Sequence, residues 1–235
     1  TYIGVYLKQA GASSFSIGLI NSAFFLGAIA SSIFSQKIIS TIGHIRSFAS
    51  FAALMVIAFL LHSVYLNEFF WGFLRLISGF SFYALLIIVE SWLNEKSSNS
   101  QRGQILAIYT IIFYLSTALG QLFLTIPKDS EFFVFTVGSV LVLFSLITIA
   151  MTKIKEPILK PFEQYSFPKL YSIVPLALTG SFIGGFFVGS FFTMLPLTIL
   201  NKFDSTTILS IFMSLTLIGG LVSSGKICLP KGSMP

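Results

Sequence analysis

The 235-residue sequence is too apolar for a water-soluble protein, because 55% of its residues are hydrophobic and only 9% are charged. A soluble domain carries about 25% charged residues. The 14 Lys and Arg residues give a net charge of +6, but they lie between the apolar segments rather than on one face, which argues against nucleic-acid binding. Composition therefore predicts a membrane protein that is surrounded by lipid.

Seven apolar segments are long enough to cross the membrane as helices, since about 20 residues span about 30 Å of hydrocarbon. Only the third contains charged residues, with Arg75 well inside it and Glu90 near its end. The sequence therefore predicts an all-α membrane protein with seven complete transmembrane helices, preceded by the tail of another. The predicted spans are residues 16–35, 47–66, 69–93, 104–126, 132–152, 171–200 and 207–224.

The positive charges in the loops predict which side of the membrane each loop faces. One alternating set of loops holds ten Lys and Arg residues, and the other set holds three. Cytoplasmic loops carry the excess, so the loop at residues 8–14 is predicted to lie outside. The segment 153–170, rich in Pro and Lys, is then a cytoplasmic linker. We expect it to separate an N-terminal half, residues 1–152, from the start of a C-terminal half, residues 171–235.

A short internal repeat supports this division. Four small residues in the first complete span are matched at one constant offset in the last span: Ser22, Gly27, Ser31 and Ser32 correspond to Ser214, Gly219, Ser223 and Ser224. Transporter halves that are built as parallel repeats produce such self-similarity. Small residues at this spacing are also common wherever membrane helices pack closely, so both interpretations stay open.

Two stretches of sequence carry a resemblance to a known family. Residues 43–46, GHIR, occupy the first predicted cytoplasmic loop, and residues 71–121 include LRLISGF, VESWLNE, QRGQILAIY and LGQ. With these motifs the sequence resembles the major facilitator superfamily, and more narrowly its YcaD-like branch. The resemblance implies a twelve-helix transporter bundle in which the seven spans are helices two to eight and residues 1–7 are the tail of helix one. It thus implies a truncated chain with an incomplete second half.

Arg75 is the first candidate for a residue on a solute path. It lies six residues into its predicted span, or about 9 Å along the helix, and an ionisable group at that depth normally faces a cavity or a partner. Its predicted role is to contact an anionic solute or to modulate a proton-carrying acid, and the alternative is a structural Arg that reaches the headgroups. Asn21, Tyr83 and Gln121 are predicted to line the same path, although such polar residues also serve as contacts between helices.

Glu90 is the centre of a predicted cytoplasmic gate. It lies 15 residues from Arg75, which is about 22 Å along the helix axis, so the two side chains cannot pair. Glu90 is instead predicted to pair with Arg46 or Arg102, next to Gly43 of the GHIR motif, in a contact that breaks and re-forms during transport. A static interfacial ion pair is the alternative.

These observations predict a secondary active transporter that moves a small solute by alternating access. We expect it to be a monomer in the lipid bilayer of the plasma membrane, or of the inner membrane if the source is bacterial, with protons as a candidate coupling ion. A truncated fragment that transports nothing is one alternative, and an integral membrane lipid-handling protein or enzyme is another. The sequence has one Cys and two His residues and no catalytic motif, so no enzyme activity, cofactor or metal site is expected.

Overall fold

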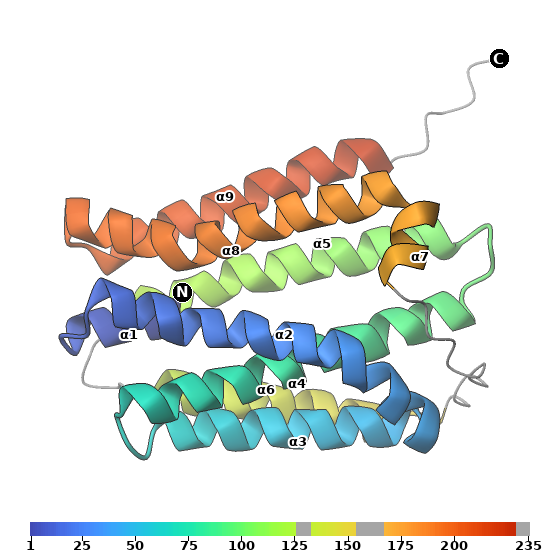
Figure 1. The fold of residues 1–235 in the computed structure, drawn as a ribbon, viewed down its shortest axis with the longest axis horizontal. Helices are drawn as coiled ribbons and strands as arrows, with labels where there is room; N and C mark the ends of the chain where they lie inside the picture. Colours follow the sequence, from blue (N-terminus) through green and yellow to red (C-terminus); the bar gives the residue numbers. More distant parts are fainter. Residues whose placement is uncertain (126–132, 154–166, 229–235) are drawn as a thin grey trace.

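The computed structural model of the chain describes residues 1–125, 133–153 and 167–228, with side chains as far as Leu221. Within these ranges every regular element is a helix, and Figure 1 shows long helices that run side by side. The all-α prediction is therefore confirmed. The helices are α1 (Tyr2–Gln9), α2 (Ser14–Ile42), α3 (His44–His62), α4 (Glu68–Lys96), α5 (Arg102–Gln121), the 3-10 helix η1 (Leu122–Thr125), α6 (Phe133–Ala150), α7 (Phe167–Ile173), α8 (Pro175–Phe203) and α9 (Thr206–Cys228).

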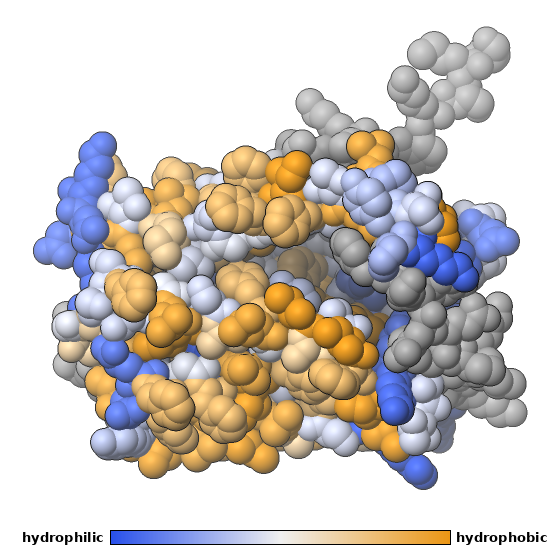
Figure 2. Space-filling view, in the orientation of Figure 1, coloured by the Kyte–Doolittle hydropathy of each residue, from blue (hydrophilic) through white to orange (hydrophobic). Residues whose placement is uncertain are grey.

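Six of these segments are long and apolar enough to cross a membrane: α2, α3, α4, α5 with η1, α6 and α8. The seventh predicted span corresponds to α9, whose described apolar part, Thr206–Leu221, is shorter. Apolar side chains cover the flank of the bundle, and hydrophilic side chains gather at its two ends (Figure 2). This distribution is that of a multi-pass membrane protein.

The helix boundaries differ from the predicted spans where the backbone turns. Helix α2 continues to Ile42 and α3 begins at His44, because Gly43 between them adopts a φ of 88°. Glycine enters this left-handed region without the steric cost that a side chain would add. At the other end of the bundle, the Asn67 side chain accepts a hydrogen bond of 3.0 Å from the backbone nitrogen of Phe70 and so caps α4.

The sixth predicted span is two helices instead of one. Helix α7 ends at Ile173, and α8 begins at Pro175. Val174 between them has a φ of −134° and a ψ of 57°, which is outside the helical region. A proline ring disfavours the helical conformation of the residue before it, so Pro175 accounts for the break. Pro196, by contrast, lies inside α8, which continues to Phe203.

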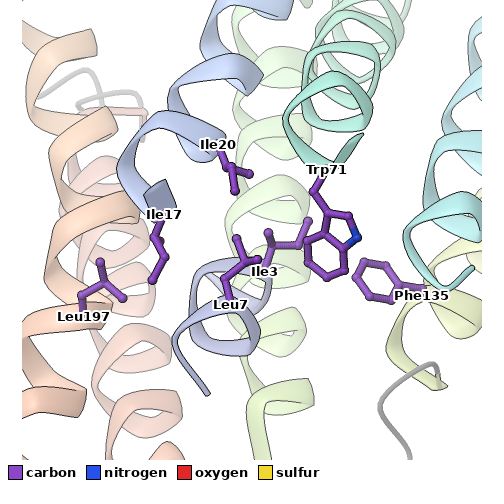
Figure 3. Packing of buried hydrophobic residues seen from close by; sticks show 7 residues of the cluster. All are labelled: Ile3, Leu7, Ile17, Ile20, Trp71, Phe135 and Leu197. Atoms are coloured by element: carbon purple, nitrogen blue, oxygen red, sulfur yellow. The ribbon is translucent and has the colours of Figure 1, made fainter. Parts of the chain in front are cut away.

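The helices pack in two groups that α1 connects. Helix α4 packs against α2 and α3, and α6 packs on α3, whereas α9 packs against α5 and α8 (Figure 1). Helix α1 contacts both α2 and α8. Two of its buried side chains belong to an apolar cluster to which α2, α4, α6 and α8 also contribute (Figure 3). The cluster consists of Ile3, Leu7, Ile17, Ile20, Trp71, Phe135 and Leu197.

The predicted division into halves is not tested by this packing. Residues 154–166 of the predicted linker lie outside the described residues, and residues 167–170 form the start of α7. Helix α5, which belongs to the predicted N-terminal half, packs chiefly along α9. The repeated small residues also differ in their surroundings. A Cβ on Gly27 would lie 2.7 Å from the backbone nitrogen of Phe80, whereas one on Gly219 would meet no atom within 4 Å in the part of the chain that the structure describes. The two halves and the repeat stay predictions.

Candidate functional site

The crossing of α2 and α4 fixes the position of the predicted solute-contact residues. A Cβ on Gly79 would lie 2.8 Å from the carbonyl carbon of Phe24, and one on Gly27 would come as close to the backbone of α4. Because real Cβ atoms essentially never approach backbone this closely, only glycine fits at both positions, and the two backbones touch. Arg75 lies one helical turn before Gly79, so the crossing holds it against α2.

The guanidinium of Arg75 has few partners of its own. Its Nη2 donates a hydrogen bond of 3.4 Å to the Asn21 side-chain oxygen, and its Cζ lies 4.3 Å from the centre of the Phe24 ring. A cation in this position is attracted by the face of the ring. The Arg75 Nε is buried without a hydrogen-bond acceptor among the described residues, and no described carboxylate forms an ion pair with the guanidinium. N–H groups of Arg75 therefore remain for a ligand.

Three of the four predicted path residues gather around Phe24. Asn21 is buried, and the ring of Tyr83 has its centre 6.0 Å from that of Phe24. Sequence reasoning missed Phe24, which is one of 27 Phe residues. The available signal was its place three residues after Asn21, because residues three apart share a helix face.

The fourth predicted path residue, Gln121, lies elsewhere, at the contact between α5 and α9. Its backbone oxygen accepts a hydrogen bond of 2.8 Å from the Ser210 hydroxyl, and Ser214 donates one of 3.0 Å to the backbone oxygen of Ala118. These bonds come where α5 passes into η1, and backbone groups inside a membrane need partners from protein. The side-chain nitrogen of Gln121 donates a hydrogen bond of 3.4 Å to the Thr117 backbone oxygen of its own helix, and the side-chain oxygen has no partner among the described residues. Its place on a solute path stays a prediction.

The predicted gate residues all lie at the opposite end of the bundle from the Asn67 cap. Gly43 forms the turn between α2 and α3, and Arg46, Glu90 and Arg102 are exposed. In the part of the chain that the structure describes, no ion pair joins Glu90 to either Arg. Glu90 instead interacts electrostatically with Tyr109 of α5. The gate stays a prediction.

His44 is a buried residue of this end that sequence reasoning did not assign to the gate. Its Nε2 lies 3.2 Å from the Ser91 hydroxyl, and its ring centre lies 5.7 Å from that of Trp92. His44 belongs to the GHIR motif, and Ser91 and Trp92 belong to VESWLNE. Two motifs that are far apart in the sequence therefore meet in space, next to Glu90.

The second histidine, His62, is buried among aromatic rings at the end of α3. Its ring stacks on Phe135 with centres 5.3 Å apart, and its centre lies 5.1 Å from that of Trp71. The Nδ1 lies 2.6 Å from the backbone oxygen of Ala58, whereas Nε2 has no hydrogen-bond partner among the described residues. No group of three or more potential metal ligands occurs in that same set of residues.

Comparison with known proteins gives one family. A family model described as Major Facilitator Superfamily matches residues 1–233. An uncharacterized MFS-type transporter of Yersinia pestis (strain Pestoides F) is 25% identical over 94% of this chain. The uncharacterized MFS-type transporter YcaD of Salmonella newport (strain SL254) is 22% identical over 94% of it. The chain spans 59% of the length of each of these relatives.

Proposed function

The chain belongs to the major facilitator superfamily, and we propose that it carries a small solute with an anionic group across the membrane by alternating access. The observation that carries this proposal is the Arg75 guanidinium, which lies inside a membrane-spanning helix with Asn21 and Phe24 as its neighbours. The family and its transporter relatives favour a transporter over an enzyme, and the chain is a multi-pass membrane protein.

The chemistry of Arg75 favours an anionic solute. Removing a guanidinium from water costs free energy unless hydrogen-bond acceptors of the protein or a ligand replace the water molecules. The described residues supply one amide oxygen and one aromatic ring, and leave Nε without an acceptor. A carboxylate or phosphate group of a solute would complete this set, because the planar guanidinium can bind such a group through two parallel hydrogen bonds.

Alternating access would use the two ends of the bundle in turn. Arg75, Asn21 and Tyr83 would contact the solute from the end where α2 and α4 begin, and Gln121 would contact it from α5. Gly43, Arg46, Glu90 and Arg102 would form the gate at the other end. The halves, residues 1–152 and the part that begins at residue 171, would rock against each other around the linker 153–170. We place this protein as a monomer in the plasma membrane, which is the inner membrane in bacteria such as those of the relatives, with protons as the coupling ion.

Uptake into liposomes tests the proposal. The 235-residue chain, and a version extended to the full length of its gene, are reconstituted and offered a pool of carboxylates, organic phosphates and neutral sugars, with and without a proton gradient. We expect saturable uptake of an anionic solute. Arg75→Ala should lower uptake at least about tenfold, because an interaction with a charged group contributes roughly 1.5–3 kcal/mol, and Arg75→Lys should restore part of it. Lys202→Ala removes the same charge from an exposed position at the end of α8 and should leave uptake unchanged.

Several outcomes separate the parts of this proposal. Uptake of neutral solutes alone, with no effect of Arg75→Ala, would rule out the anionic solute and the role of Arg75. Uptake by the extended version alone would show that the path needs residues beyond these 235. Failure of both versions to move any pooled solute would count against transport.

A further inference from the structure

A cavity lies between the first turns of α2 and α4. It has a volume of about 540 Å³ and is lined by Ser16, Leu19 and Ile20 of α2 and by Asn67, Glu68 and Phe69 of α4. Two of the side chains that line it are exposed at the surface of the bundle: Leu19 is 64% exposed and Phe69 is 88% exposed. On α2, by contrast, Asn21 faces α1, where its Nδ2 would lie 3.3 Å from a Cβ on Gly4. We call this cavity the outer notch.

Glu68 is the charged group of the outer notch. Its neighbours are already engaged in capping: the Asn67 oxygen accepts from the Phe70 nitrogen at 3.0 Å, and the Ser16 nitrogen donates to the Ser13 hydroxyl at 3.1 Å. Glu68 is exposed and forms no hydrogen bond or ion pair through its side chain with the described residues. An ionised carboxylate only accepts hydrogen bonds, so the notch offers an acceptor for a cationic donor.

Two apolar stripes lead from the outer notch toward the α2–α4 crossing. Leu19, Ala23 and Leu26 follow one another on α2 at intervals of four and three residues, which places them on one face of the helix. Phe69, Phe73 and Leu76 repeat the same intervals on α4, and five of these six side chains are exposed. Each stripe covers eight residues, or about 10 Å of rise from its first residue to its last. The stripes converge where the Gly27 and Gly79 positions bring the two backbones together.

We propose that the outer notch and its stripes bind a phospholipid whose headgroup carries a primary ammonium, phosphatidylethanolamine. The ammonium would donate a charge-assisted hydrogen bond to the Glu68 carboxylate, and the acyl chains would lie along the two apolar stripes. A choline headgroup has the positive charge but no N–H to donate. An anionic glycerol headgroup is repelled by the carboxylate. This proposal does not depend on the proposed transport.

Lipid binding to the purified 235-residue chain tests this site. The chain in detergent is titrated with phosphatidylethanolamine, phosphatidylcholine and phosphatidylglycerol of identical acyl chains, and bound lipid is counted by native mass spectrometry. We expect phosphatidylethanolamine to bind at least about fivefold more tightly than the other two. Glu68→Gln should abolish this fivefold preference, which corresponds to about 1 kcal/mol, because the amide no longer carries the negative charge. Glu95→Gln removes an exposed carboxylate from the other end of α4 and should retain the preference.

A second variant tests the cavity independently of charge. Leu19→Trp should fill the outer notch and weaken binding of all three lipids, whereas Leu60→Trp, at an exposed position near the end of α3, should not. The proposal is overturned if Glu68→Gln and Glu95→Gln behave alike, or if phosphatidylglycerol or phosphatidylcholine binds as tightly as phosphatidylethanolamine. Equal lipid binding by Leu19→Trp and Leu60→Trp would overturn it as well.

Discussion

Burial has different consequences for Arg75 and His62, although both are polar residues in apolar surroundings. The Arg75 side chain is charged at physiological pH, so its N–H groups need acceptors that the described residues only partly provide. The His62 ring needs fewer hydrogen-bond partners. As a neutral imidazole it donates from Nδ1 to the Ala58 carbonyl and leaves a lone pair on Nε2 against aromatic neighbours. We therefore interpret Arg75 as a residue that binds a ligand and His62 as a packing residue.

This interpretation predicts opposite effects of two substitutions at His62. His62→Phe keeps a flat ring between Phe135 and Trp71 and removes the unpartnered nitrogen, so the free energy of unfolding should change by less than about 1 kcal/mol or increase. His62→Ala leaves a cavity and should cost about 3 kcal/mol. Thermal unfolding of the purified variants in detergent measures both. Equal losses from the two substitutions would show that the imidazole nitrogens matter in themselves.

Sequence reasoning located the site residues whose chemistry is unusual for a membrane span, and missed those whose chemistry is common. Arg75 and Asn21 stand out because a charge and an amide are rare in apolar segments. Phe24 does not stand out among 27 Phe residues, although it provides the ring beneath the guanidinium. His44 was visible in the GHIR motif, but its contact with Ser91 depends on how α3 lies against α4, which one sequence does not specify.

At the scale of helices, the α2–α4 crossing depends on two glycines, one on each helix. Gly79 faces the backbone of Phe24, and Gly27 faces the backbone of Leu76 and Phe80. Close backbone approach through small residues is a main source of attraction between helices in lipid, where apolar side chains gain little by leaving acyl chains. This crossing holds Arg75 against Asn21.

Substitution of Gly79 should therefore separate the helices. Gly79→Ala forces a Cβ onto the Phe24 backbone, and overpacking of this kind typically costs about 1–3 kcal/mol. Gly72→Ala is the matched control on the same helix, because a Cβ there meets no atom of the described residues within 4 Å. It should be neutral or stabilising by up to about 1 kcal/mol, since alanine favours helix more than glycine does. Unfolding of both variants in detergent gives the comparison, and equal stability would show that α2 and α4 do not touch at Gly79.

Most spans could be predicted from hydropathy because the membrane imposes a length on apolar segments. Helix ends could not, because they depend on local backbone geometry. Gly43 joins α2 directly to α3 through a positive φ, so the helices extend into residues that hydropathy assigns to a loop. Pro175 ends the helical conformation at Val174 and divides one predicted span into α7 and α8, whereas Pro196 is accommodated within α8. Composition alone does not distinguish these two prolines.

At the scale of the whole molecule, the loops gather at the two ends of the bundle. The α1–α2, α3–α4 and α8–α9 connections lie at one end, and the α2–α3 and α4–α5 connections lie at the other (Figure 1). Lys8 donates a hydrogen bond to the side chain of Asn201, which joins α1 to α8 at the first of these ends. The loops with few positive charges thus lie together, as the alternation of charges along the sequence predicts.

The charge distribution predicts that the end with Lys8 faces away from the cytoplasm. Single cysteines in a Cys228→Ala background test this orientation with a maleimide that does not cross membranes. Val64→Cys, at a position that is 73% exposed in the α3–α4 connection, should react in intact cells. Asn99→Cys, at an exposed position between α4 and α5, should react only after the cells are permeabilised. The reverse pattern would invert the bundle: Arg75 and the outer notch would then lie near the cytoplasm, and the predicted gate around Glu90 would lie outside.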